Sequence, residues 1–316
     1  MSLQPRKCVK KNYQYLFAGL LFITLIITIF TCPAVARSGK ANFSDSSGEE
    51  YSKESDNLDV PYLPTPMELV RKILNLGSVG PRDFLIDLGS GDGRIVITAA
   101  KEYGARGIGV DLNEKLVALS KKYAVAEGVE EKTSFFVQDV FKTDIKDATI
   151  VTLYLLKDVN LQLRPKLLAE LKPGTRVISH DFHMGEWRPD KILFLNVLKP
   201  YQDYTILYLW IVPSMAAGTW HWKFILMNEA HTFDLVLDQS YQDISGVVRN
   251  RGYDWRIFDA SMEGDRIQFS LVGEADVQMI RQDYKGRVQG NSINGTMEYD
   301  TTVGKVSLKW RATRGN

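Results

Sequence analysis

The sequence predicts a doubly wound α/β sheet of seven strands, followed by a separate antiparallel β domain. A glycine-rich turn lies between the apolar runs 84–86 and 95–97, which is how a βαβ unit begins. Apolar runs then alternate with helical patterns as far as about residue 213. Beyond that point apolar residues alternate with polar ones at period two. The length of 316 residues and 45% hydrophobic content agree with two cores.

Residues 1–36 have the layout of a signal peptide or a membrane anchor. Basic residues between positions 6 and 11 precede the uncharged apolar stretch Leu16–Phe30, and Ala34-Val35-Ala36 follows as a small-x-small cleavage site. If the segment is uncleaved, residues 13–36 would contact a membrane. We therefore expect a chain that is anchored to a membrane or translocated across it, on a side that the sequence leaves open.

Residues 37–59 are predicted to be a disordered linker, because they are rich in Ser, Asp and Glu and poor in apolar residues. Order begins at Val60. Thr65 is predicted to cap a helix whose first residue is Pro66, with Glu68 completing a capping box and Gly77 ending it. The rigid arm at 61–64 would suit a lid over a bound ligand.

The glycine-rich stretch reads Phe-Leu-Ile-Asp-Leu-Gly-Ser-Gly-Asp-Gly-Arg from residue 84. A dinucleotide fold prefers G-x-G-x-x-G around a pyrophosphate. Here Asp87 stands two residues before Gly89, and Gly91 and Gly93 follow. The carboxylate would repel a pyrophosphate, whereas it suits a ligand that carries an ammonium group. The stretch resembles the first motif of the seven-strand S-adenosylmethionine-dependent methyltransferases, in which this loop holds the amino-acid end of the cofactor.

Further strands are predicted after the loop, with helices between the early ones. The last two are close enough in sequence to form a hairpin. Their ranges are 107–111, 134–139, 148–154, 175–180, 192–198 and 205–212.

Acidic residues stand at the carboxyl ends of three predicted strands. In an open α/β sheet, ligands bind beyond these ends. Asp87, Asp111 and Asp139 lie there, one per strand. Asp111 is placed to accept both ribose hydroxyls, and Asp139 to accept from an adenine amino group. Any one of them alone is as well explained by a helix cap or a turn.

The stretch from Val60 to Trp187 resembles the small lysine N-methyltransferases of the mitochondrial inner membrane and their bacterial relatives. The shared phrases are V-P-Y-L-P-T-P, D-L-G-S-G-D-G-R, G-V-D, V-T-L-Y-L-L, L-R-P, L-K-P-G-T-R-V-I-S-H and M-G-E-W. The resemblance implies S-adenosylmethionine as cofactor and a lysine of a protein, possibly a membrane protein, as acceptor. It also implies a bacterial envelope or mitochondrial inner-membrane location.

The same resemblance implies roles for particular residues. Tyr154 and the Ser179-His180 pair would line the acceptor slot, with Tyr154 and His180 as the catalytic residues. Two roles stay open for His180, a proton acceptor or a structural hydrogen bond at the strand end. Cofactor contact is implied for Tyr62, Thr65, Asp87, Gly89, Gly91, Asp111 and Asp139.

A lysine acceptor must first lose a proton. Its ordinary pKa of about 10.4 makes this cost roughly 4.6 kcal/mol at pH 7. An apolar slot lowers that cost because burial disfavours the charged form. Tyr154 and Phe182 are predicted to form its aromatic wall.

Residues 214–316 are predicted to form an antiparallel barrel or sandwich, with the alternating aromatic residues in its core. Ile244-Ser245-Gly246 and Ile293-Asn294-Gly295 echo one another and predict two similar hairpins. This domain has no apparent catalytic constellation. The methyltransferase domain spans 60–213, so the resemblance does not extend to this part.

The composition excludes several functions. A net charge of +1 gives no field for nucleic acid, and the base-flipping signature is absent. Cys8 and Cys32 are the only cysteines and the four histidines are scattered, so no metal site is predicted. Two alternatives remain: a small-molecule methyltransferase of the same fold, or an envelope binding protein with a vestigial cofactor site. The latter gains weight because a secreted chain would leave the compartment where S-adenosylmethionine is made.

Overall fold

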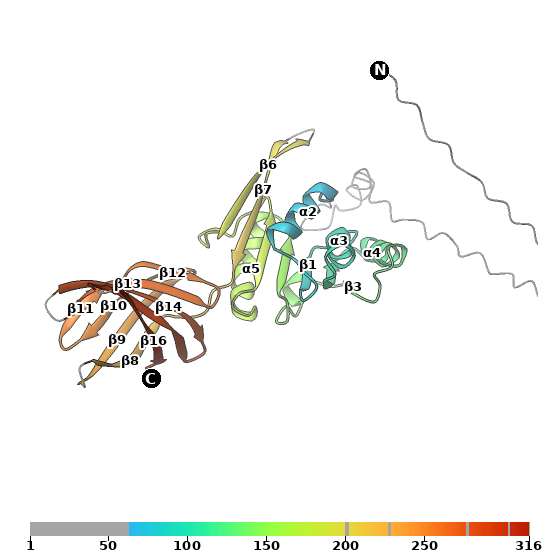
Figure 1. Cartoon of the computed structure of the whole chain (residues 1–316). Helices are drawn as coiled ribbons and strands as arrows, with labels where there is room; N and C mark the ends of the chain where they lie inside the picture. Colours follow the sequence, from blue (N-terminus) through green and yellow to red (C-terminus); the bar gives the residue numbers. More distant parts are fainter. Residues whose placement is uncertain (1–62, 200–201, 227–228, 276–277, 303, 316) are drawn as a thin grey trace, which may run out of the picture. The chain divides into compact units, whose positions relative to one another are not determined.

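The computed structural model describes residues 63–199, 202–226, 229–275, 278–302 and 304–315 (Figure 1). The predicted targeting segment at 1–36, the predicted linker at 37–59 and Tyr62 therefore lie outside the described residues. Within the ranges given, no helix has both the length and the apolar character that crossing a bilayer requires.

Seven strands form the first sheet, in the spatial order β3-β2-β1-β4-β5-β7-β6. Strands β1 to β5 are parallel, and β7 runs antiparallel to both β5 and β6. The chain order reverses at the neighbours β1 and β4, and ligands of doubly wound sheets bind at such a point. The bounds are β1 Phe84–Leu88, β2 Arg106–Asp111, β3 Thr133–Val137, β4 Ile150–Leu153, β5 Arg176–His180, β6 Lys191–Lys199 and β7 Gln202–Ile211.

Helices cover both faces of this sheet, which confirms the predicted fold class. Leu85 points into one core, and its neighbour Ile86 points into the other, as the period of a strand requires. The first core also contains side chains of α2 (Met67–Leu76), α3 (Arg94–Tyr103) and α4 (Glu114–Ala126). The second contains side chains of α5 (Lys157–Glu170). A short 3₁₀ helix, η1 (Val140–Lys142), follows β3.

The start of α2 differs from the prediction. Pro66 is the N-cap residue, and no side chain caps the helix, so the predicted capping box is wrong. The hydroxyl of Thr65 instead lies 3.3 Å from Nδ1 of His180 at the end of β5. The helix ends at Gly77 as predicted.

Strands β6 and β7 form a hairpin that extends past the end of β5 (Figure 1). The last residue of β5, His180, pairs with Leu207, and Leu207 pairs with Leu193, so residues 194–199 and 202–206 lie beyond the end of β5. The connection from β5 to β6 carries no helix. One face of the hairpin packs on the first core, whereas Ile192 and Phe194 on the other face are 47% and 68% exposed.

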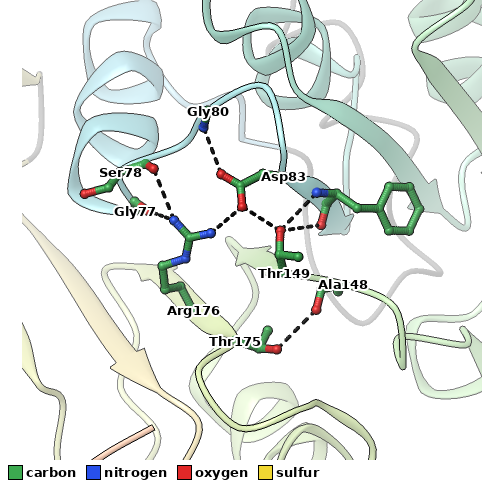
Figure 2. A network of polar contacts seen from close by, with 9 residues as sticks. Gly77, Ser78, Gly80, Asp83, Ala148, Thr149, Thr175 and Arg176 are labelled. Atoms are coloured by element: carbon green, nitrogen blue, oxygen red, sulfur yellow. Dashed lines mark hydrogen bonds and ion pairs between the residues drawn. The ribbon is translucent and has the colours of Figure 1, made fainter. Parts of the chain in front are cut away.

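A polar network fastens the opposite, amino-terminal edge of the sheet (Figure 2). The Thr149 hydroxyl donates to Asp83 at 2.7 Å and accepts from the backbone N–H of Phe84 at 2.9 Å. Arg176 pairs with Asp83 and also donates to the carbonyl of Ser78. These contacts join the starts of β1, β4 and β5 to the end of α2. The network thus lies at the edge of the sheet opposite the carboxyl ends of the strands, where ligands of such sheets bind.

The second sheet is a nine-stranded antiparallel meander, in the order β11-β10-β9-β8-β16-β15-β14-β13-β12. In chain order, the last strand of this sheet, β16, pairs with the first, β8. A hydrogen bond of 3.1 Å from Ile257 to Gly246 brings the two edges together, so the barrel is nearly closed. The bounds are β8 Gly218–Leu226, β9 Glu229–Ser240, β10 Asp243–Asn250, β11 Tyr253–Arg256, β12 Phe258–Glu263, β13 Arg266–Ala275, β14 Gln278–Gln289, β15 Ser292–Thr301 and β16 Gly304–Arg314.

Aromatic side chains fill this barrel, as predicted. Phe269 and Tyr284 stack with ring centroids 4.8 Å apart, and Trp310 meets both edge-on. The two echoing motifs lie in the hairpins β9–β10 and β14–β15. A Cβ on Gly246 or Gly295 would lie 2.1 or 1.9 Å from a backbone oxygen of the neighbouring strand. Only glycine permits these close approaches.

Candidate active site

A cavity of about 230 Å³ opens at the carboxyl ends of β1, β2 and β4. Most of the predicted site residues line it. Tyr62 lies outside the described residues, and His180 stands behind the lining. The predicted residues that line the cavity are Thr65, Asp87, Gly89, Gly91, Asp111, Asp139 and Tyr154.

The glycine loop needs its glycines. Gly89, Gly91 and Gly93 have φ of 83°, 53° and 79°, in the left-handed region that favours glycine. A Cβ on Gly89 would lie 2.7 Å from Leu155, and one on Gly93 would lie 2.6 Å from the Cβ of Ser120. The loop ends at the N-terminus of α3, where free backbone N–H groups favour an anion.

Asp111 holds this loop in place. One carboxylate oxygen accepts from the backbone N–H of Gly91 at 2.8 Å, and the other accepts from that of Asn113 at 2.9 Å. Burial raises the pKa of the carboxyl. Each oxygen keeps a second lone pair for a ligand hydroxyl. Asp111 therefore stabilises the turn by binding the backbone, and its remaining lone pairs can still accept hydrogen bonds from the ribose hydroxyls, as predicted.

Asp87 is almost completely buried at the cavity, with 2% of its surface exposed. It accepts a hydrogen bond of 2.6 Å from the Thr152 hydroxyl. Burial, with smaller effects of the Asp111 and Asp92 charges, raises the pKa of Asp87 to about 7, although the Thr152 hydrogen bond opposes this. A ligand cation would favour the ionised form, so the position suits an ammonium group.

Asp92 and Arg94 form a buried ion pair that the sequence reasoning missed. Both are at most 3% exposed, and two guanidinium nitrogens donate to the carboxylate at 2.7–3.2 Å. The third guanidinium nitrogen donates to the backbone carbonyl of Thr65 at 2.8 Å. The pair thus ties the arm before α2 to the glycine loop. In the sequence, the only indication of this ion pair is that the two residues stand on either side of Gly93.

Asp139 is a helix cap as well as a lining residue. It accepts from the backbone N–H of Phe141 at 2.9 Å and lies 3.5 Å from the ammonium group of Lys142. Phe141 and Leu112 line the same end of the cavity and are 39% and 51% exposed. Apolar side chains beside a hydrogen-bond acceptor suit a flat, polar-edged ring.

Tyr154 separates the cavity from His180. The Tyr154 ring stacks on the imidazole with centroids 3.9 Å apart. The centroid of the Phe182 ring lies 6.4 Å from that of Tyr154, and the two rings are tilted relative to one another. Burial, and secondarily the charge of Asp181, raises the pKa of the Tyr154 hydroxyl. The aromatic wall predicted from Tyr154 and Phe182 is therefore present in the structure.

His180 is fully buried, and both ring nitrogens are engaged. Nδ1 lies 3.3 Å from the Thr65 hydroxyl and Nε2 lies 2.8 Å from that of Thr205. Thr205 in turn donates to the carboxylate of Asp181, which only accepts. The Thr205 oxygen must therefore accept from the Nε2–H of His180. This geometry fits the structural role and not the proton acceptor.

The residues present fit S-adenosylmethionine. Besides the carboxylates and the glycine loop, the buried hydroxyl oxygen of Ser90 lines the cavity and has no hydrogen-bond partner among the described residues. A polar atom so placed needs a ligand or water. Within the same described ranges, no three acidic, His or Cys side chains gather closely enough to hold a metal ion.

The part of the chain that forms this site is similar to known methyltransferases. The family model of the ANTKMT methyltransferase domain matches residues 87–191. A protein-lysine N-methyltransferase of Saccharolobus islandicus is 43% identical over 135 residues, which span 42% of this chain and 84% of that protein. A human lysine N-methyltransferase, named for the C subunit of ATP synthase, is 30% identical over 196 residues, or 60% of this chain and 75% of that protein.

A solved structure is similar over the same part. It is named an RNA methyltransferase from Salinibacter ruber in complex with S-adenosyl-L-homocysteine, and it is 46% identical. The match covers 48% of this chain and 95% of that one, with a TM-score of 0.46.

Proposed function

Because the chain belongs to the family of protein-lysine N-methyltransferases, we propose that it methylates lysine side chains of a membrane-associated protein. It is an S-adenosylmethionine-dependent enzyme, and the cofactor supplies the methyl group from its sulfonium centre. The observation that carries the proposal is one cavity that joins the buried Asp87 and the half-buried Asp111 to the aromatic wall at Tyr154.

In this proposal the chain holds the cofactor by complementary groups. Asp87 binds the ammonium group, and the N–H groups of the glycine loop at the start of α3 bind the carboxylate. Asp111 accepts from the ribose hydroxyls. Asp139, with Phe141 and Leu112, holds the adenine ring.

The acceptor lysine enters beside Tyr154 and Phe182. An apolar slot disfavours the ammonium form and so makes loss of the proton less costly. The Tyr154 hydroxyl has no hydrogen-bond partner among the described residues, and it lines the cavity. It is therefore available to orient the amine. Methyl transfer is an in-line displacement, so this orientation is the main contribution of the protein.

A membrane-associated substrate and location are supported by two apolar features. The β6–β7 hairpin exposes Phe194 and Tyr204 beyond the site edge of β5, by 68% and 54%, and Ile192 level with Ser179, by 47%. The basic flank and apolar stretch at 1–36 favour an anchor through residues 13–36. The name of the human relative gives a protein, the C subunit of ATP synthase, as its acceptor. A lysine acceptor on a protein is thereby favoured over a small molecule.

The test compares cells with and without this chain. Membrane and soluble proteins are digested separately and searched by mass spectrometry for methyllysine. We expect methyllysine peptides that depend on the chain in the membrane fraction. Chain-dependent methyllysine only in soluble proteins would refute the membrane target while keeping the enzyme class.

Fractionation of the same cells tests the location. A C-terminally tagged full-length chain should sediment with membranes and resist a high-salt wash. Recovery of full-length chain only in the soluble fraction would contradict the anchor.

A further inference from the structure

The outer face of four neighbouring barrel strands, β13 to β16, is rich in basic side chains. Buried and exposed residues alternate along these strands, so the exposed ones point outward. Strand pairing places eight of them in two adjacent rows, which contain five cations and no acid and which we call the basic face. The first row is Arg266, Arg287, Asn294 and Arg311, and the second is Gln268, Lys285, Thr296 and Lys309.

Three cations of the basic face have no ion-pair partner among the described residues. They are Lys285, Lys309 and Arg311. The barrel is not basic as a whole, because residues 214–316 carry 12 Lys and Arg against 13 Asp and Glu. The excess of positive charge is therefore local to this face.

Two arginines of the basic face oppose each other directly. Arg266 and Arg287 are cross-strand partners, and like charges in such positions destabilise a sheet. Arg287 donates to Asp265 at 2.6 and 2.8 Å through one terminal nitrogen, whereas Arg266 reaches Glu263 only at 4.0 Å. An anion bound between the two guanidinium groups would relieve their repulsion.

A hollow of about 500 Å³ lies on the basic face. Three cations line it, with Glu263 as the single acid of the lining. Guanidinium groups bind phosphate oxygens in a bidentate manner, and the uncharged polar side chains of the lining can also donate hydrogen bonds. The hollow is therefore suited to a phosphate group. The cations are Arg266, Lys285 and Arg287, and the uncharged donors are Ser261, Gln268, Asn294 and Thr296.

The composition of the basic face favours a lipid surface over other anionic partners. Its two rows contain no aromatic and no large apolar side chain. Single-stranded RNA binds by stacking its bases on aromatic side chains, and protein interfaces have an apolar core. A layer of anionic headgroups needs neither, because it attracts Lys and Arg by charge alone.

The part of the chain before the described residues gives a second reason for a bilayer. The basic flank and the apolar stretch Leu16–Phe30 predict an anchor. Roughly 30 residues separate Phe30 from the first described residue, Leu63, and a flexible chain of this length reaches about 30 Å. An anchored chain would thus keep the barrel at high local concentration near the headgroups.

We propose that the basic face docks on anionic lipid headgroups, with a lipid phosphate in the hollow. The inference rests on the membrane location in the proposed function and gives the barrel a role in it. The anchor attaches the chain, and the barrel adds a contact that depends on lipid charge. Docking holds the folded part of the chain close to the bilayer, where a membrane-associated acceptor is found.

The test measures how close the barrel comes to the bilayer in the full chain. Cys8→Ser and Cys32→Ser remove both native cysteines, and Ser307→Cys on the exposed side of β16 carries a donor dye. The chain is reconstituted into vesicles whose headgroups carry a sparse acceptor dye. The vesicles are phosphatidylcholine alone or phosphatidylcholine with phosphatidylglycerol. Energy transfer should be higher with phosphatidylglycerol and should fall at high salt, which screens exposed charges.

A triple variant removes the three unpaired cations and breaks no ion pair. It combines Lys285→Gln, Lys309→Gln and Arg311→Gln. Each basic residue near an anionic membrane accounts for roughly a fivefold change in binding, so the ratio of docked to undocked chain should fall about 150-fold. Energy transfer with phosphatidylglycerol should then drop to the level seen with phosphatidylcholine alone.

The matched control removes three exposed cations from the methyltransferase domain. It combines Lys121→Gln, Lys122→Gln and Lys132→Gln, and energy transfer should stay at the wild-type level. Melting curves of both triple variants should match that of wild type.

Three results would overturn the proposal. One is energy transfer that does not depend on phosphatidylglycerol. Another is a dependence that the basic-face variant keeps, or that the control variant loses equally. The third is loss of energy transfer when RNA is added at the same phosphate concentration, which would assign the face to nucleic acid. No acceptor protein or methyl transfer enters this measurement, so a failure of lysine methylation is distinguishable from a failure of docking.

Discussion

Cofactor affinity should depend on pH through Asp87. Its pKa is raised to about 7, and an ammonium group binds its ionised form. The ionised fraction in the free protein is then about 3% at pH 5.5 and about one half at pH 7. We expect the association constant for S-adenosylhomocysteine to rise roughly 15-fold over this interval. Isothermal titration calorimetry measures it, and staying below pH 7 keeps the ligand amine protonated.

Substitution by asparagine isolates this carboxylate. Asp87→Asn keeps the acceptor for Thr152 but has no charge, so affinity should fall to the low-pH level and lose its pH dependence. Asp144→Asn removes an exposed charge and serves as the control. An unchanged slope in Asp87→Asn would refute the assignment of Asp87 to the ammonium group.

The same raised pKa affects folding in the opposite direction. A carboxyl whose folded pKa exceeds its ordinary 3.8 stabilises the fold fully below pH 3.8, and this stability is lost as pH rises through 7. Three pKa units correspond to about 4 kcal/mol, which is the cost of the buried charge at pH 8. Asp87→Asn should therefore raise the melting temperature of the ligand-free protein at pH 8. A lower melting temperature there would show that the carboxylate is not destabilising.

Three further substitutions test the site and the barrel. Asp111→Ala should weaken cofactor binding roughly 10- to 150-fold, because it removes hydrogen bonds to a charged group; equal titration curves would contradict the ribose placement. Arg94→Met leaves Asp92 buried and unpaired and should cost about 3–5 kcal/mol of unfolding free energy. A loss below about 1 kcal/mol in denaturant titration would contradict this. Gly295→Ala places a Cβ 1.9 Å from the Lys285 carbonyl oxygen and should abolish the near-ultraviolet circular dichroism of the barrel tryptophans. Gly80→Ala, which meets nothing within 4 Å, should leave that signal intact.

The sequence was sufficient for features that are local or periodic. The strand at Phe84–Leu88, the glycine loop and the acids at strand ends follow from spacing alone, and their meeting at one edge follows from parallel pairing. The period-two pattern after residue 213 likewise predicted the barrel. Nothing in that pattern specified which strands pair, and so the return of β16 to β8 came only from the structure.

Features that depend on distant partners were mispredicted or missed. Thr65 has the right neighbours for a helix cap, but His180 lies 115 positions away and takes its hydroxyl. Asp92 and Arg94 had no assigned role, because the carbonyl that Arg94 binds belongs to Thr65, 29 positions earlier in the chain. Asp111 was predicted to accept from ribose hydroxyls, with a turn or helix cap as the alternative, and the structure shows that it binds the backbone of Gly91 and Asn113. Its replacement is therefore expected to loosen the loop as well as to remove a ligand contact.

The central claim is lysine methylation, and a single labelling experiment tests it most directly. Purified full-length chain is incubated with S-adenosylmethionine labelled in its methyl group and with a membrane fraction from cells lacking the chain. RNA is offered in parallel as an alternative acceptor. Products are hydrolysed and separated. We predict label in N-methyllysine with wild type and little with Asp87→Asn. Label in nucleotides, or in another amino acid with none in N-methyllysine, would contradict the claim.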